Sequence, residues 1–356
     1  MKEKVICGLQ QVGIGVKDAD VAWKWYRENF GVDIPVVADE GVAERMLPYT
    51  GGKPQPRYAI LAVNLQGGGG LEIWEPRGRA LNYPKQQPSL GDLGIFIAKI
   101  RSRDVAATYD EFSRKGLRLL SAPTVSFAGI KHFYLMDPWD NILEVEEDNY
   151  VMVKSKTCTT GGTTGAVLGV SDMDRSIAFY GKVLGFDKVQ ADKTGVFEDL
   201  KGVPGGDRQV RRVLLARTKP FTGPLSELMG PSHLELVQAL DAPVVKLYEN
   251  RYWGDPGYIQ ICFDVRNMDA VEADCKAAGH PFVCDSGVDF DMGDANGHFT
   301  YIEDPDGTLI EFVETFKIPI AKKFGLYLNL ANKDDYKPLG ILKLLRFAKV
   351  KRESIK

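Results

Sequence analysis

Cysteine and histidine, the residues most often found in disulfide frameworks and metal sites, are scarce in this chain. Its 356 residues include five cysteines and four histidines. The cysteines are odd in number and form no CxxC pair, which favours reduced, buried thiols over disulfides. The N-terminus, MKEKVICGLQQ, has no apolar signal segment, and no run of about 18 apolar residues follows it. We therefore expect a cytoplasmic protein without a membrane span.

An excess of either charge is also missing. The 45 basic and 48 acidic residues give a net charge of −3, which does not indicate nucleic-acid binding. The C-terminal part differs, because residues 317–356 hold eleven basic and three acidic side chains. Within it, Ile341, Leu344 and Leu345 stand at helical spacing between basic residues, so residues 338–352 predict a basic amphipathic helix. We expect this helix to dock on the acidic remainder of the chain or on a partner subunit rather than on a membrane.

One design recurs four times along the chain. Residues 9–31 have the pattern of a strand, a capping aspartate and an amphipathic helix that ends at a glycine, and residues 164–186 repeat it. Variants occupy residues 92–116 and 258–279. Further β-type segments follow each helix and close on a Leu-Glu or Ile-Glu pair, which places glutamates at Glu72, Glu144, Glu235 and Glu311. The pattern predicts an α+β protein of four βαβββ modules.

A β-hairpin is predicted near the end of the fourth module, in HFTYIEDPDGTLIEFVE. The Asp-Pro-Asp-Gly sequence is typical of a tight turn between two strands. If the turn pairs Glu303 with Thr308, Thr300 lies opposite Glu311, and His298 shares the face of Glu311. The second module repeats the hairpin, and the same parity places His132 on the face away from Glu144.

These motifs resemble the vicinal oxygen chelate superfamily, which includes glyoxalase I, methylmalonyl-CoA epimerase, fosfomycin-resistance proteins and type I extradiol dioxygenases. The resemblance rests on VSDMDRSIAFYGKVLGF, on DPDGTLIEF and on the order of the modules, and it covers nearly all of residues 5–316. It implies that two modules curve into a sheet around a cup that holds a divalent metal. It also implies metal ligands on the first and last strands of each module. We expect domain 1 at residues 1–150, domain 2 at residues 151–316, each with two modules and one cup, and a basic tail at residues 317–356.

The first predicted cup has oxygen ligands and a cation nearby. Its candidate residues are Gln11, Glu72, Asp92, Glu144 and Lys131. Such a set suits Mg²⁺, Mn²⁺ or Ca²⁺, and it equally suits a carboxylate cluster satisfied by lysine and water. None of the four first strands carries the usual histidine, so the absence of any metal is an open alternative.

The second predicted cup contains two imidazoles. Its candidate ligands are His233, Glu235, Gln260, His298 and Glu311. This set suits a borderline divalent ion such as Zn, Fe, Ni or Mn. Gly165 stands in the third module at the first-strand position that Gln260 has in the fourth. It leaves a gap in the predicted set of ligands, which indicates either room for a substrate or a degenerate site.

Three functions follow from these alternatives. The first is a glyoxalase-like, metal-dependent isomerase, epimerase or lyase that forms an enolate of a small oxygenated metabolite, with Glu311 or Glu235 as the base and His298 as the acid. The second is a non-haem iron, ring-cleaving dioxygenase. The third is a metal-free binding protein with aromatic residues such as Trp253 lining its pocket. In each case we expect a small-molecule ligand, no nucleic acid, no membrane and, as an open alternative, a homo-oligomer.

Overall fold

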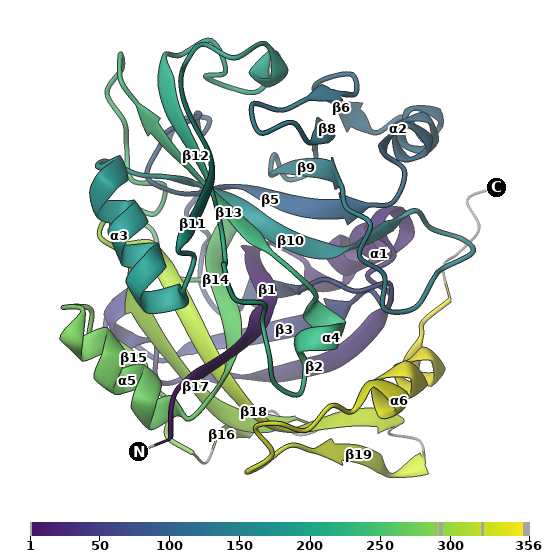
Figure 1. Ribbon diagram of the computed structural model, residues 1–356. Helices are drawn as coiled ribbons and strands as arrows, with labels where there is room; N and C mark the ends of the chain where they lie inside the picture. The colour runs from purple at the N-terminus through teal and green to yellow at the C-terminus, as the bar shows by residue number, and fades with distance from the viewer. Residues whose placement is uncertain (1, 289, 292–294, 322–323, 352–356) are drawn as a thin grey trace.

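Two large curved β-sheets dominate the computed structural model, which describes residues 2–288, 290–291, 295–321 and 324–351, with the backbone alone at 290 and 291. The helices lie on the outside of the sheets (Figure 1). The predicted fold class is confirmed, since each of the four modules begins with a strand and a helix and continues in β-strands. Among the described residues, no helix is long and apolar enough to cross a membrane.

The elements follow the predicted repeat. Module 1 consists of β1 (Val5–Gly15), α1 (Ala19–Phe30), β2 (Ile34–Ala43), β3 (Gln55–Val63) and β4 (Gly70–Pro76). Module 2 consists of β5 (Gly94–Ser102), α2 (Val105–Arg114), β6 (Arg118–Leu119), β7 (Thr124–Val125), β8 (Lys131–Met136) and β9 (Ile142–Glu147).

The second half of the chain repeats this order and adds a C-terminal extension. Module 3 consists of β10 (Thr160–Gly169), α3 (Met173–Leu184), β11 (Lys188–Gly195), β12 (Val210–Ala216), α4 (Ser226–Met229) and β13 (His233–Ala239). Module 4 consists of β14 (Gly257–Arg266), α5 (Met268–Ala277), β15 (Cys284–Asp285), β16 (Phe290–Asp291), β17 (Asn296–Glu303) and β18 (Leu309–Ala321). The extension adds β19 (Leu326–Asn329), α6 (Leu339–Leu342) and the 3₁₀ helix η4 (Lys343–Ala348).

The first helix of each half begins and ends as the sequence predicts. The carboxylate of Asp18 accepts a hydrogen bond from the Val21 amide, and that of Asp172 accepts one from the Arg175 amide. Each helix then stops at a glycine with φ near 70°, a left-handed conformation that favours glycine. Because these caps fix where each helix begins, they also fix how the preceding strand enters its sheet.

The modules do not pair in chain order. One sheet joins module 1 to module 4 through antiparallel β1 and β14, and the other joins module 2 to module 3 through antiparallel β5 and β10. The prediction that modules 1 and 2 form one cup, and modules 3 and 4 another, is therefore wrong. We call the cup of modules 1 and 4 the outer-module cup, and that of modules 2 and 3 the inner-module cup.

Modules 1 and 2, like modules 3 and 4, make contact through a helix and a turn instead. The hydroxyl of Tyr26 on α1 donates to Asp137 Oδ2 in the β8–β9 turn, at 2.5 Å. The hydroxyl of Tyr180 on α3 donates to Asp304 Oδ2 in the β17–β18 turn, at 2.8 Å. All four side chains are buried. Each odd-numbered module thus shares a sheet with one neighbour and packs its helix against another.

The basic C-terminal segment docks on its own chain. Strand β18 continues past residue 316 and pairs with β19, so the sheet extends into the predicted tail. Leu342 and Leu345 are 0% and 1% exposed, in an apolar cluster with residues of β2, β18 and α4. Lys349 Nζ lies 2.8 Å from Asp33 Oδ2. The predicted helix is present but short, spanning α6 and η4, and Arg352 lies outside the described residues.

We predict that Tyr26→Phe and Tyr180→Phe each destabilise the protein. Each change removes a hydrogen bond to a buried carboxylate, which costs about 1–3 kcal/mol. Urea unfolding of each variant measures the loss. Tyr83→Phe is the matched control, because Tyr83 is 58% exposed. Equal midpoints for all three variants would contradict the structural role of these contacts.

Candidate functional site

Two carboxylates and two amides converge at the centre of the outer-module cup. Gln11 on β1 and Glu72 on β4 come from module 1, and Gln260 on β14 and Glu311 on β18 come from module 4. In both modules the first and last strands run parallel. Gln11 is aligned with Gly70 and Gln260 with Leu309, in each case two residues before the glutamate. The internal repeat therefore places two equivalent Gln-Glu pairs opposite one another.

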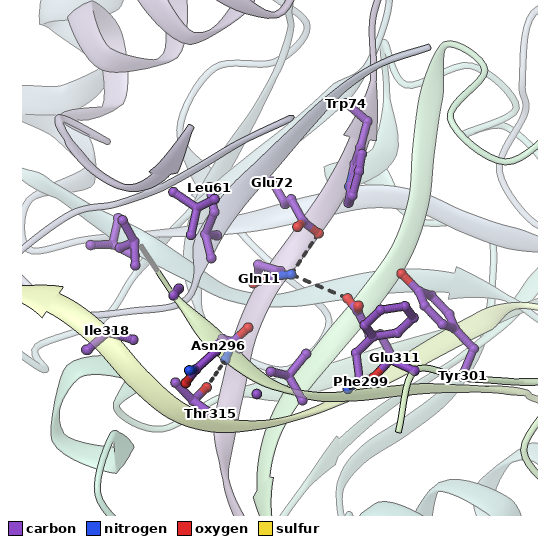
Figure 2. Close-up of a pocket in the computed structure, with 18 of the residues that line it drawn as sticks. Gln11, Leu61, Glu72, Trp74, Asn296, Phe299, Tyr301, Glu311, Thr315 and Ile318 are labelled. Carbon is purple, nitrogen blue, oxygen red and sulfur yellow. Dashed lines mark hydrogen bonds between the residues drawn. The ribbon is translucent and has the colours of Figure 1, made fainter. Parts of the chain in front are cut away.

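The four side chains are buried and in contact with one another. Gln11 Nε2 donates to Glu72 Oε2 at 2.7 Å and lies 3.4 Å from Glu311 Oε2, as Figure 2 shows. Gln260 Nε2 donates to Glu72 Oε2 at 3.1 Å. Gly13 makes room for the Gln260 amide, because a Cβ at Gly13 would come within 2.6 Å of it.

Burial dominates the electrostatics of the two carboxylates. Burial, and then the charge of Glu311, raise the pKa of Glu72 well above its usual range. Burial also raises the pKa of Glu311 to about 7, although hydrogen bonding to Tyr301 and to both glutamines opposes the rise. The amide oxygens Gln11 Oε1 and Gln260 Oε1 have no hydrogen-bond partner among the described residues. Two carboxylates and two unpaired amide oxygens together fit a hard divalent ion.

This donor set contains few of the most common metal ligands. The described part of the chain holds no group of three or more His, Cys, Asp or Glu side chains arranged to hold a metal. The outer-module cup instead combines two glutamates with two glutamines, and all four donor atoms are oxygens. Oxygen ligands of this kind are typical of sites for Mg²⁺, Ca²⁺ and Mn²⁺.

A cavity of about 400 Å³ opens beside Gln11, Glu72 and Glu311. Near Glu72 and Glu311 its walls are aromatic, formed by Trp74, Tyr301 and Trp253. The volume lies within the range of roughly 300–1,000 Å³ that is typical of small-molecule pockets. The cavity therefore has the size of a small-molecule pocket, and Glu72 and Glu311 beside it are buried.

His298 does not belong to this site, which corrects the predicted hairpin register. Tyr301 lies opposite Glu311, and His298 lies opposite Glu314 on the other face of the sheet. The turn holds one residue more than predicted, because Glu303 pairs with Leu309, and the Asp304 carboxylate accepts the amides of Asp306 and Thr308. A shift of one residue moves every side chain of a strand to the opposite face.

The hairpin of module 2 shows the same shift. Tyr134 lies opposite Glu144, so His132 shares the face of Glu144, and its Nδ1 atom lies 2.6 Å from Glu144 Oε1. The prediction that His132 faces away is wrong. Lys131 points to solvent beside Glu147 and is not part of either cup.

The inner-module cup is filled by the protein's own cations. Lys99 Nζ lies 2.6 Å from Glu144 Oε2 and 2.9 Å from Glu235 Oε2. Arg212 donates to Glu235 and Asp199 at 2.8 Å. Burial opposes ionisation of Glu235, but the charges of Arg212 and Lys99 hold its pKa at about 2. Ammonium and guanidinium groups thus occupy the position that the outer-module cup leaves to another cation.

The predicted ligand sets are consequently divided. Of the second set, Gln260 and Glu311 lie in the outer-module cup, whereas His233 and Glu235 lie in the inner-module cup, with His233 Nε2 3.1 Å from Glu146 Oε2. Gly165 leaves no room for a substrate, because a Cβ there would come within 1.9 Å of the His233 carbonyl oxygen.

The first predicted set is divided in the same way. Gln11 and Glu72 are in the outer-module cup, and Glu144 is in the inner-module cup. Asp92 lies in the loop before β5, where its carboxylate accepts the amides of Ser89 and Val245. Lys99, Arg212 and Tyr301 were not predicted as site residues. The sequence signal that could have identified Tyr301 is Asp304, because its carboxylate accepts the turn amides and so sets the register of the hairpin.

Comparisons with known proteins agree with this architecture. The sequence model of the "Glyoxalase/Bleomycin resistance protein/Dioxygenase superfamily" matches residues 8–145 and 164–312. Glyoxalase I from Zea mays has a similar fold, with a TM-score of 0.52 and 17% identity over 88% of this chain and 92% of that one. A putative dioxygenase from Bacillus subtilis has a TM-score of 0.56 and 11% identity over 98% of both chains. No curated protein matches the sequence.

We predict that Lys99→Met destabilises the protein by about 3–5 kcal/mol, because it leaves buried carboxylates without their countercharge. Chemical unfolding measures the change. Lys131→Met is the control, since Lys131 makes only an exposed ion pair with Glu147 and its loss costs at most about 1 kcal/mol. Similar losses in the two variants would show that Lys99 is not the internal cation.

We also predict that acid weakens the inner-module cup. The pKa of Glu235 is about 2 in the folded state against an ordinary value of 4.5, so its contribution is complete above pH 4.5 and is lost as the pH falls toward 2. Protonation of Glu235 lowers the free energy of unfolding by up to about 1.4 kcal/mol per pH unit in that window. Unfolding at pH 5, 4 and 3 should give a smaller slope for Glu235→Gln than for the wild type. An unchanged slope would contradict the assignment.

Proposed function

Because this chain belongs to the Glyoxalase/Bleomycin resistance protein/Dioxygenase superfamily, we propose that its outer-module cup binds a divalent metal ion and acts on a small substrate with two adjacent oxygen atoms. The observation that carries the proposal is the pair of unpaired amide oxygens, on Gln11 and Gln260, beside two buried carboxylates. In this assignment Gln11, Glu72, Gln260 and Glu311 hold the ion. The oxygen donors favour Mn²⁺ or Mg²⁺ over Zn²⁺.

The proposed reaction is proton transfer next to a carbonyl group, as in an isomerase, epimerase or lyase. A bound divalent ion supplies Lewis-acid stabilisation of the negative charge that develops on the substrate oxygens. Glu311 takes the proton from the substrate carbon. In the metal-free cup burial raises the pKa of Glu311 to about 7, which makes this carboxylate a stronger base than an exposed glutamate. Tyr301, opposite Glu311 in the hairpin, positions that carboxylate.

The arrangement of the histidines counts against the dioxygenase alternative. A two-histidine, one-carboxylate iron site needs two imidazoles in one cup with room for substrate. His132 and His233 contact glutamates of the filled inner-module cup, and His298 lies 2.7 Å from Asp285 on the outer face. His280 Nδ1 donates to the Glu303 carbonyl oxygen at 2.8 Å, outside both cups. His298 therefore cannot be the general acid that the sequence suggested.

We predict that the wild type binds one Mn²⁺ ion and that Glu311→Gln and Gln260→Ala each weaken this binding about 100-fold or more, because the first removes the negative charge of a ligand and the second removes a ligand. Isothermal titration calorimetry on the chelator-treated protein measures the affinity. His298→Ala is the matched control, since His298 lies on the neighbouring strand but faces away. Binding that survives Glu311→Gln but is lost in His298→Ala would overturn the choice of site.

We further predict that the Mn²⁺-loaded protein accelerates deuterium exchange at the carbon next to the carbonyl group of hydroxyacetone in D₂O. Glu311→Gln should slow this exchange about 100- to 10,000-fold, the contribution typical of a general base. Proton NMR follows the exchange, and circular dichroism checks that the variant is folded. Full activity in a folded Glu311→Gln variant would rule out the proposed base.

A further inference from the structure

The cavity of the outer-module cup extends far from its carboxylates along strand β18. Glu311, Val313, Thr315 and Ile318, all on β18, line it in succession. Seven residues separate the first from the last, which corresponds to about 23 Å in an extended strand. Figure 2 shows Ile318 and Leu61 well away from Tyr301. The cavity is therefore elongated, with its polar site at one end.

The far end of this cavity is apolar and is formed partly by residues beyond the family match. The match ends at residue 312, whereas Ile318, at the end of β18, and Leu345, in the C-terminal extension, lie beyond it. Leu228 and Met229 of α4 complete the wall, and Figure 1 shows α4 and α6 close together, as their contacts confirm. The extension thus forms part of the cavity as well as covering the surface.

The wall is held in a fixed position. The η4 helix packs on β2 and β18, and Leu345 is buried in the apolar cluster there. Beyond η4, the Val350 amide donates to the Asp33 carbonyl at 2.9 Å, next to the Lys349–Asp33 ion pair. A wall anchored on both sides retains its shape when a ligand enters, which favours selection by size and polarity.

The cavity offers little to a substrate with several negative charges. Its charged lining residues are the cations Arg45 and Arg57 and the acids Glu44, Glu72 and Glu311. Arg57 already donates to the carboxylate and the carbonyl oxygen of Asp39. Among the described lining residues, Arg45 at the exposed rim is therefore the one cation that forms no ion pair with a carboxylate, and a substrate bearing several phosphates or carboxylates would lack anchors.

From this combination we infer that the substrate is an elongated molecule with an apolar tail, such as an alkyl or aryl chain, attached to the pair of oxygens. Its oxygens lie at Glu72 and Glu311, and its tail runs along β18 past Val313 to Ile318 and Leu345. The C-terminal extension is then the part of the chain that determines specificity. The position of the oxygens rests on the proposed function, whereas the position of the tail rests on the cavity alone.

Alkyl hydroxamates test this inference, because they chelate a metal through two adjacent oxygens and differ only in their tails. Calorimetry on the Mn²⁺-loaded protein compares acetohydroxamate, butanohydroxamate, hexanohydroxamate and octanohydroxamate. We expect the affinity to rise about four-fold per methylene group, the usual gain from burying one. Affinity that stays flat from acetohydroxamate to octanohydroxamate would overturn the inference.

Two variants locate the tail. Val313→Phe narrows the middle of the cavity and Leu345→Phe shortens its far end, so both should remove most of the gain for octanohydroxamate and leave acetohydroxamate binding unchanged. Phe347→Leu is the matched control, because Phe347 is in η4, 62% exposed and not part of the lining. An equal gain in Val313→Phe, Leu345→Phe and the wild type would contradict the assignment.

A metal-free arm separates failure of the inference from failure of the proposed function. If neither Mn²⁺ nor acetohydroxamate binds, the proposed function fails, and binding of the neutral fluorescent probe N-phenyl-1-naphthylamine to the metal-free protein decides the inference alone. The inference predicts that octanamide displaces this probe from the wild type. It also predicts that Val313→Phe weakens binding of the probe at least several-fold. No binding of the probe, or equal binding to the variant, would refute it.

Discussion

Buried carboxylates need a positive charge or a proton nearby, and this requirement distinguishes the two cups of the molecule. Each module ends in a strand that carries a glutamate into the centre of a cup, and these four carboxylates are nearly inaccessible to water. A buried carboxylate must be neutralised by a proton or a cation, since its desolvation otherwise costs several kcal/mol, on the order of the whole stability of a domain. The two cups meet this requirement in different ways.

In the inner-module cup the chain supplies the charge itself. Lys99 and Arg212 lie against Glu144 and Glu235, which stay ionised, and the space is filled. In the outer-module cup the amides of Gln11 and Gln260 donate to Glu72 where Lys99 and Arg212 stand in the other cup, and burial raises the pKa values of Glu72 and Glu311. A cup that already contains its cation is part of the structural core. A cup that lacks one has the electrostatics of a binding site.

The order of the modules places this site where the two ends of the chain meet. Because β1 pairs with β14, residues more than 240 positions apart share the outer-module cup, and the C-terminal extension can reach its open end. The helix-to-turn contacts Tyr26–Asp137 and Tyr180–Asp304 keep sequential modules together while their strands belong to different sheets. Ile318 and Leu345, which lie beyond the family match, thus line the same cavity as Gln11, Glu72 and Glu311.

Local patterns in the sequence predict the local structure well. Asp18 and Asp172 cap helices, the modules repeat as expected, and Gln11, Glu72, Gln260 and Glu311 all point into a cup. Two features escaped prediction because they depend on tertiary geometry. The pairing of modules is set by contacts between whole sheets, and no single sequence motif predicts it. The hairpin register depends on one extra turn residue, and the Asp304 carboxylate stabilises the longer turn by accepting the Thr308 amide. In this register Tyr301 lies in the site and His298 lies outside it.

Anomalous diffraction from crystals of the Mn²⁺-loaded protein tests the central claim most directly, because it locates the ion without reference to activity. The account predicts one strong peak within coordination distance, about 2.1–2.3 Å, of oxygen atoms of Gln11, Glu72, Gln260 and Glu311, and no peak beside Lys99. A peak beside His233 and Glu235, with the outer-module cup empty, would contradict it.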